Sequence, residues 1–266
     1  MPDPIKVIVC GPNGRMGSET VLAVAGDPAL CLVGVVRRGS EQSFSAAGLT
    51  VPAALDLGPL LAATAPACVV DFTTAEAAIR HGQAALARGV AFVTGTTGFG
   101  AEDLTALQRQ ANEHHAGCIV APNFAIGAVL AAHFAAIAAK HFAWAEVIEL
   151  HHERKADAPS GTALATARSM VAARGAPFEQ TEVTKQTLPG TRGGEVDGVH
   201  VHSVRLPGLV AHQEILFGGQ GEVLTIRHDS THRNSFMPGV LLAIKHAVAE
   251  PGYVFGLGPL LGLRSE

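Results

Sequence analysis

The sequence predicts a two-domain protein of the α/β class, with a parallel β-sheet domain and a second, α+β domain that carries an open mixed sheet. In the first half of the chain, short continuous apolar runs alternate with helical stretches, which is typical of a parallel sheet covered on both faces. Beyond residue 124, several apolar strands follow one another with short Gly- and Pro-containing turns. A chain of 266 residues is long enough for two such domains.

The order of these patterns predicts the individual elements. In the first half, strands are expected over 5–10, 31–36, 67–72, 90–94 and 117–121, with helices over 14–25, 75–88 and 101–115. In the second half, we expect helices over 125–141, 161–174 and 235–248, strands over 146–152, 199–206, 210–217 and 222–228, and a flexible loop over 189–198. The last helix resembles the first half in composition, so the predicted domains are 1–124 with 234–266, and 125–233.

Composition excludes several classes of protein. The net charge of −4 and the absence of a basic run argue against a nucleic-acid binder. The N-terminus lacks a secretory signal pattern, and the apolar stretch 124–139 is shorter than the ~20 residues of a membrane span. The four cysteines form no CxxC pair and lie in or beside predicted strands, so we expect reduced core thiols in a cytoplasmic protein with no membrane partner.

A glycine-rich turn follows the first predicted strand and opens the next helix. It reads Gly11-Pro12-Asn13-Gly14-Arg15-Met16-Gly17. Gly11 permits a tight turn, and Gly14 lets a pyrophosphate approach the helix N-terminus. The spacing GxxGxxG differs from the commoner GxGxxG, so a turn with packing glycines is the alternative. Its position between strand and helix favours dinucleotide binding.

Two arginines follow the second predicted strand, where a ribose-binding carboxylate is usual. The strand ends at Val36, and Arg37 and Arg38 come next. Guanidinium groups at this place can bind a 2′-phosphate, which favours NADPH without excluding NADH. A solvated surface pair, or stacking of Arg37 on adenine for both cofactors, is the alternative.

Two more turns lie at the ends of later strands and are weak signals by themselves. The turn over 95–99 includes Gly95, Thr96 and Thr97, whose backbone and hydroxyls can line the nicotinamide side of a crevice. The turn over 121–124 follows the fifth predicted strand. Ordinary loop turns are the alternative for both.

The segment 149–163 carries the groups that proton transfer and anion binding require. His151 and His152 titrate near neutral pH, and Lys155 supplies a positive charge. Because the two histidines are neighbours on a predicted strand, their side chains are expected to point to opposite faces, which disfavours chelation of one metal. The alternative is that the histidines are structural.

A helix start follows these residues. Ser160 is expected to be its N-cap, and the backbone N–H groups of Gly161 and Thr162 can bind a carboxylate. The alternative is a plain capped helix. His200 and His202 share one strand face and form a possible metal pair, but no Cys, Asp or Glu spacing completes a zinc site, so we predict no metal. The histidines on helical stretches, His81 among them, are expected to be surface or packing residues.

At these residues the chain resembles the 4-hydroxy-tetrahydrodipicolinate reductase family, also called dihydrodipicolinate reductases, of the diaminopimelate–lysine pathway. The resemblance runs essentially end to end, and 149–163 is its specific part. It implies a Rossmann-type cofactor domain completed by a C-terminal helix, a substrate and oligomerisation domain, and a homotetramer. The implied reaction uses NADPH or NADH to reduce a cyclic dicarboxylate, with hydride added at C4 and a proton delivered at C3.

The resemblance also implies roles for individual residues. His151 is the acid/base group, Lys155 acts beside it, and the substrate contacts fall on His152, Gly161, Thr162 and Arg233. The cofactor contacts, with the two arginines included, fall on Gly11, Pro12, Asn13, Gly14, Arg15, Met16, Arg37, Arg38, Gly95, Thr96, Thr97, Ala121, Pro122, Asn123 and Phe124. Family members often carry an acidic residue near Val36, and its absence here puts NADH preference in doubt.

Two other functions remain as alternatives. One is another two-domain dehydrogenase of amino-acid metabolism, against which the Ser-Gly-Thr turn beside paired histidines speaks. The other is a regulator that senses NADPH without turnover, against which the presence of both an acid and an anion site speaks. The fold alone does not decide between them.

Overall fold

The computed structural model describes residues 3–39 and 42–263. The ends of the predicted first domain, 1–2 and 264–266, and positions 40–41 lie outside this part. Contacts between Cα atoms divide the chain into two compact units. The first contains the residues up to Phe124 and the segment that starts at Phe236, and the second contains Ala125–Ser235.

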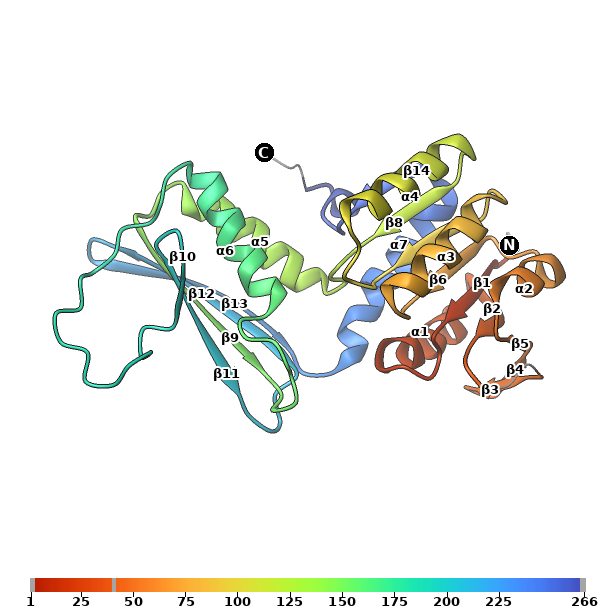
Figure 1. The fold of residues 1–266 in the computed structure, drawn as a ribbon, viewed down its shortest axis with the longest axis horizontal. Helices are drawn as coiled ribbons and strands as arrows, with labels where there is room; N and C mark the ends of the chain where they lie inside the picture. The colour runs from red at the N-terminus through yellow and green to blue at the C-terminus, as the bar shows by residue number, and fades with distance from the viewer. Residues whose placement is uncertain (1–2, 40–41, 264–266) are drawn as a thin grey trace. The chain divides into compact units, whose positions relative to one another are not determined.

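The first unit is built on a seven-stranded sheet in the order β14-β8-β7-β6-β1-β2-β5, and each pairing of neighbours is parallel (Figure 1). Its strands are β1 (Ile5–Cys10), β2 (Leu30–Val36), β5 (Ala53–Ala54), β6 (Cys68–Asp71), β7 (Ala91–Thr94), β8 (Gly117–Val120) and β14 (Gly252–Phe255). The central strands β6, β7 and β8 are buried at every residue. That burial explains their continuous apolar runs, because helices cover a parallel sheet on both faces.

The helices of this unit follow the strands along the chain. They are α1 (Arg15–Gly26), α2 (Leu57–Thr64), α3 (Ala75–Leu86), α4 (Ala101–Glu113) and α7 (Met237–Ala249), with a short 3-10 turn over Pro259–Leu261. Another 3-10 turn, Arg233–Phe236, lies where the second unit ends and the first resumes. A core cluster joins the sheet to α2, α3 and α4. The C-terminal helix α7 contacts α1, and Lys245 Nζ donates to Asp27 Oδ2 at 2.6 Å.

The second unit carries a five-stranded sheet in the order β10-β11-β9-β12-β13. Its elements are α5 (Ile126–Ala139), β9 (Trp144–His151), α6 (Gly161–Arg174), β10 (Gly194–Val196), β11 (Val199–Arg205), β12 (Ala211–Gly219) and β13 (Glu222–Ser230). Strand β11 runs parallel to β9, whereas the other pairings are antiparallel. Helices α5 and α6 pack with the strands around a second core (Figure 1).

The predicted fold class is confirmed, with a parallel-sheet domain and an open mixed sheet in a second unit. Several elements were missed, and one expected loop contains a strand. The hairpin of β3 (Phe44–Ala46) and β4 (Leu49–Val51), the strands β5 and β14, and helix α2 were not predicted. The expected loop over 189–198 contains β10, which pairs with β11. These elements are short, and most owe their form to pairing with a distant strand, which periodicity does not report.

One cysteine departs from the prediction of core thiols. Cys10, Cys68 and Cys118 are buried, but Cys31 is exposed. It points to the face opposite Leu30 and Leu32, near the amino end of β2, where the sheet is not fully covered. Across residues 3–39 and 42–263, no helix combines the length and the apolar character needed to cross a bilayer.

Candidate active site

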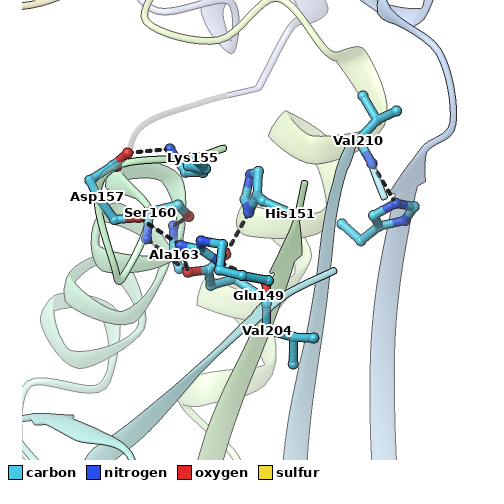
Figure 2. Close-up of polar contacts among 10 residues, drawn as sticks. Glu149, His151, Lys155, Asp157, Ser160, Ala163, Val204 and Val210 are labelled. Carbon is cyan, nitrogen blue, oxygen red and sulfur yellow. Dashed lines mark hydrogen bonds and ion pairs between the residues drawn. The ribbon is translucent and has the colours of Figure 1, made fainter. Parts of the chain in front are cut away.

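A buried carboxylate holds the histidine predicted to be the acid. Glu149 and His151 lie two residues apart on β9, so both side chains point to the same face of the sheet. The Glu149 side chain is fully buried, and His151 Nδ1 lies 2.5 Å from Glu149 Oε2 (Figure 2). A carboxylate has acceptors only, so Nδ1 carries the proton of this bond and Nε2 is the ring nitrogen left for another partner.

An arginine from the neighbouring strand binds the same carboxylate. Arg205 pairs with His151 in the register of β11 against β9. Its guanidinium donates to both oxygens of Glu149, at 2.8 and 2.7 Å, which is the bidentate geometry of strong ion pairs. Arg205 also donates to the carbonyl oxygens of Val204 and Asp157, at 2.8 and 2.7 Å.

This environment keeps Glu149 ionised. Burial alone would raise the pKa of its carboxyl group, but the hydrogen bonds from His151 and Arg205 outweigh burial and lower the pKa to about 2. The carboxylate is therefore charged at neutral pH. We expect the bond from Nδ1 to this carboxylate to fix the orientation of the His151 ring.

The loop after β9 brings the predicted lysine and helix start to the same place. Lys155 Nζ donates to Asp157 Oδ1 at 2.7 Å, and its side chain is 21% exposed (Figure 2). The backbone N–H of Ser160 donates to Glu149 Oε1 at 3.1 Å. Glu149 is thus bonded directly to His151 and to the residue that precedes α6.

Helix α6 begins as predicted, at Gly161, and ends as predicted, at Arg174. Ser160 is its N-cap, because Ser160 Oγ accepts from the N–H of Ala163 at 3.1 Å. Gly161 and Thr162 are exposed, and N–H groups in the first turn of a helix have no acceptor within the helix. The start of α6 therefore offers donors and a positive dipole end to an anion.

Two other predicted substrate residues are less closely tied to this group. Strand β9 ends at His151, so the prediction that His152 lies on the strand was wrong, and the expected alternation of faces does not extend to it. Arg233 is half-buried at the start of the turn Arg233–Phe236, in the same unit as His151.

The first unit contains a cavity of about 560 Å³ at the glycine-rich turn, which we call the glycine-turn cavity. Of the predicted cofactor residues, those that line it are Gly11, Pro12, Asn13, Gly14, Arg37 and Arg38. The others, which do not line it, are Arg15, Met16, Gly95, Thr96, Thr97, Ala121, Pro122, Asn123 and Phe124. Asp56 and Arg80 also line this cavity and were not predicted.

The glycines of this turn are required by its shape. Gly11 has φ of +82°, which L side chains rarely adopt, and a Cβ on Gly17 would lie 1.9 Å from the carbonyl oxygen of Gly11. Gly14 caps α1 without a side-chain hydrogen bond. The N-terminus of α1 therefore stays accessible to a phosphate group, as dinucleotide binding requires.

Arg37 is half-buried and held in place, whereas Arg38 is exposed. The Arg37 guanidinium lies over the ring of Phe44, 5.7 Å from its centroid, and donates to the carbonyl oxygen of Ser43 at 3.0 Å. The unpredicted β3–β4 hairpin supplies Phe44. Both arginines thus stand at the cavity, in different environments.

Beneath the cavity, a second buried carboxylate binds a histidine. Asp71 ends β6, and its side chain accepts from His81 Nδ1 at 2.6 Å, from the N–H and hydroxyl of Thr73, and from the hydroxyl of Thr96. His81, which also lines the cavity, is nearly buried on α3. Asp71 therefore ties the turn that follows β6 to the predicted turn that follows β7.

The described residues contain one group of three possible metal ligands, Cys10, Asp71 and His81, whose ligand atoms lie within 4.8 Å of one another. Burial, together with the nearby Asp71 charge, raises the pKa of the Cys10 thiol, whereas a metal-bound cysteine must lose its proton. Asp71 is already occupied by four hydrogen bonds. Of the histidine pair on β11, His202 Nε2 lies 2.9 Å from Glu146 Oε2.

Sequence reasoning assigned no role to Glu149, Arg205 or Asp71, and it expected His81 to be a surface or packing residue. The spacing of Glu149 and His151 was a signal, since residues two apart share a face of a strand. Arg205 comes from 56 positions further along the chain and gave no local signal.

Comparisons with known proteins agree with this arrangement. The family model for the N-terminus of dihydrodipicolinate reductase matches residues 5–124, and the model for its C-terminus matches 127–261. A 4-hydroxy-tetrahydrodipicolinate reductase of Dehalococcoides mccartyi is 46% identical, covering 98% of this chain and 99% of the relative. One from Geobacillus kaustophilus is also 46% identical, covering 97% and 99%.

Comparison with solved structures identifies the same family of reductases. The dipicolinate-bound dihydrodipicolinate reductase of Paenisporosarcina sp. TG-14 has a TM-score of 0.88 at 42% identity, covering 96% of this chain and 98% of that one. An amine dehydrogenase of Mycobacterium smegmatis, at 14% identity and a TM-score of 0.65, shares the fold alone. The resemblance seen in the sequence, and with it the class of NAD(P)H-dependent oxidoreductases, is confirmed: the chain belongs to the dihydrodipicolinate reductase family.

Proposed function

We propose that this chain reduces 4-hydroxy-tetrahydrodipicolinate to tetrahydrodipicolinate in the diaminopimelate–lysine pathway, with His151 as the proton donor. In the overall reaction, the substrate, NAD(P)H and one proton give the product, NAD(P)⁺ and water. Loss of the 4-hydroxyl group as water converts the substrate into a conjugated cyclic imine, and the bound cofactor would supply the hydride that adds to C4 of this imine. The observation that carries the proposal is the set of Glu149-held His151, Lys155 and the exposed start of α6 in one unit.

The chain's own groups then complete the reaction. Hydride addition at C4 moves electron density toward the ring nitrogen and leaves an enamine, which must receive a proton at C3. His151 Nε2 is the nitrogen that delivers it, because Nδ1 is bonded to Glu149. General acid catalysis of this kind contributes ~10²–10⁴-fold to the rate.

The dicarboxylate substrate needs positive groups and N–H donors. Lys155 supplies an ammonium, and Gly161 and Thr162 supply backbone donors at the positive end of α6. His152 and Arg233 are proposed as further contacts, as the resemblance implies. Lys155 is counted as catalytic here because it acts directly on the substrate beside the acid.

The glycine-turn cavity is the proposed site of the dinucleotide. Its fit rests on the N-terminus of α1, where no side chain accepts the cap hydrogen bond, and on the two arginines that line the cavity. The turns over 95–97 and 121–124, with Arg15 and Met16, are proposed to contact the rest of the cofactor. We propose that NADPH binds at least as tightly as NADH, since Arg37 and Arg38 stand where a 2′-phosphate is bound.

The proposal also assigns a function to each of the two units. The unit with the parallel sheet, predicted as 1–124 and 234–266, binds the cofactor. The unit predicted as 125–233 binds substrate and mediates assembly into a homotetramer, working in the cytoplasm without nucleic-acid or membrane partners. Analytical ultracentrifugation tests the assembly.

A coupled assay tests the reaction. Dihydrodipicolinate synthase is allowed to form the substrate, and oxidation of NADPH or NADH is followed by absorbance. Turnover that depends on the synthase product supports the proposal. Cofactor binding without turnover would favour the NADPH-sensing alternative, and turnover with a different amino-acid-pathway substrate would favour another dehydrogenase.

A further inference from the structure

We propose that Glu149 and Arg205 are positioning residues that couple the proton donor to the anion-binding turn, so that one buried ion pair orients both halves of the substrate site. This inference rests on the proposed function of His151. It concerns two residues that touch neither substrate nor cofactor in the mechanism above.

The first step of the argument is connectivity. Glu149 binds His151 at 2.5 Å through Oε2, and the N–H of Ser160 at 3.1 Å through Oε1. Arg205 binds both oxygens of Glu149 and also the carbonyl oxygen of Asp157, whose carboxylate receives Lys155. His151 and the N–H of Ser160 are therefore bonded directly to Glu149, and Lys155 is linked to Arg205 through Asp157 (Figure 2).

The second step is burial. The Glu149 side chain has no exposed surface, and those of His151 and Arg205 are 15% and 19% exposed. Breaking a buried charge pair by removing one partner is costly, so the pair holds a single arrangement. A carboxylate held this way fixes which ring nitrogen of His151 carries a proton before substrate arrives.

The third step is charge. A carboxylate favours a positively charged imidazole, and a guanidinium disfavours it. On the neighbouring segments, the charged and titratable groups nearest to His151 in sequence or register are Glu149 on β9 and Arg205 on β11. The loop after β9 adds His152, Glu153, Arg154 and the Lys155–Asp157 pair, and strands β12 and β13 add the His212–Asp229 pair, His228, and Arg227 with its partner Glu214. The segment 126–132 of α5 and the first turn of α6 contain none.

The chain offers a matched control on the same strand. Glu146 of β9 also binds an arginine and a histidine, with Arg192 at 2.5 Å and His202 at 2.9 Å. It lies three positions before Glu149 on the strand, so it points to the other face of the sheet. Glu146→Gln removes a similar carboxylate without touching His151 or Ser160.

The test compares Glu149→Gln, Glu149→Asp, Arg205→Gln and Glu146→Gln by kcat, KM and pH–rate profile, with circular dichroism as a check of folding. Glu149→Gln is expected to lower kcat by at least about 10²-fold, with a smaller change in KM. The limb of the profile that falls with rising pH should move to lower pH in Glu149→Gln. It should move to higher pH in Arg205→Gln, because the opposing positive charge is gone.

A purely structural role would not move the limb in opposite directions. Glu149→Asp keeps the charge for Arg205 but withdraws the acceptor from His151, so it should fold and lose kcat without the large pH shift. In ¹⁵N-histidine spectra, with His151 assigned through His151→Gln, the Nδ1–H form should dominate in wild type and decline in Glu149→Gln.

The outcomes separate the two proposals. If wild type does not turn over the synthase product, the proposed function fails. If wild type is active and the folded Glu149 variants match Glu146→Gln in kcat and pH profile, the coupling role of Glu149 is overturned. Should Glu149→Gln not fold, a folded Glu149→Asp with wild-type kcat overturns it equally.

Discussion

Each unit of the molecule contains a buried carboxylate bonded to Nδ1 of a histidine, and the two pairs differ in what else the carboxylate binds. Asp71 and His81 lie 2.6 Å apart in the first unit, and Glu149 and His151 lie 2.5 Å apart in the second. Both carboxylates have no exposed side-chain surface, and the two histidine side chains are similarly shielded, at 11% and 15% exposed. Burial therefore does not distinguish the pairs.

The remaining hydrogen bonds do distinguish them. Asp71 accepts from the Thr73 and Thr96 turns, so its bonds join two loops at the carboxyl edge of one sheet. Glu149 accepts from the guanidinium of Arg205 and from the start of α6. A carboxylate already balanced by a guanidinium can orient a histidine that gains and loses a proton. We therefore expect the pair in the first unit to be structural, and the pair in the second unit to orient the proton donor proposed above.

The largest expected effect tests that contrast directly. His151→Gln should raise the barrier by about 3–5 kcal/mol, seen as a fall in kcat with little change in cofactor affinity, since proton delivery and orientation are both lost. The matched variant His81→Gln should leave kcat at saturating cofactor near wild type. Steady-state kinetics decides, and a near-normal kcat in His151→Gln would remove His151 as the acid.

The second prediction concerns acid stability. The pKa of Glu149 is about 2, against an ordinary 4.5, so its contribution to stability is complete above pH 4.5 and is lost as the pH falls toward 2. The difference corresponds to roughly 3 kcal/mol. Urea unfolding of wild type and Glu149→Gln between pH 2 and 7 measures it. The two curves should converge toward low pH, and a constant gap would show that this carboxylate is not the source.

The third prediction compares one lysine from each unit by the effect of its removal on KM and kcat. Lys155→Ala should raise KM for the substrate, by an amount equivalent to roughly 1.5–3 kcal/mol, and lower kcat as well, since a charged hydrogen bond is lost. Lys245→Ala, which removes the comparable Lys245–Asp27 pair of the first unit, is the control and should change neither. Turnover and KM of Lys155→Ala within twofold of wild type would make Lys155 a surface charge.

The smallest expected effect concerns the binding of NADPH and NADH at the glycine-turn cavity. Replacing both Arg37 and Arg38 with Ala should weaken NADPH by about 1–3 kcal/mol and NADH less, because partly exposed guanidinium–phosphate contacts are screened by salt. Arg88→Ala, outside the cavity lining, is the control. Titration with both cofactors measures the difference, and an equal loss for each would show adenine stacking and would contradict the NADPH preference.

The sequence predicted the elements whose signals are local. Helix α6 was predicted to the residue, because Ser160 caps its start and Gly175, with φ of +74°, ends it. The parallel sheet was predicted from its buried apolar runs. Strand β14 was missed, since its form depends on pairing with β8, and the exposure of Cys31 depends on coverage that no pattern reports.

The candidate site was predicted in part for the same reason. His151, Lys155 and the α6 start lie within one short segment, so their types and spacing were readable. Arg205 reaches Glu149 only through the register of β11 against β9, and Asp71 reaches Thr96 across two strands. Such contacts depend on the order and register of the strands in the sheet. Residue spacing in a single sequence does not reveal them.

The return of the chain to its first unit sets an order for folding during synthesis. Helix α7 and strand β14 complete a sheet that begins at Ile5, whereas the unit Ala125–Ser235 is uninterrupted. A ribosome therefore releases all of the inserted unit before it has made the last strand of the surrounding one. The first unit cannot complete its sheet until β14 is made, and until then the edge of β8 is unpaired. A nascent chain halted before Gly252 is therefore expected to be prone to aggregation.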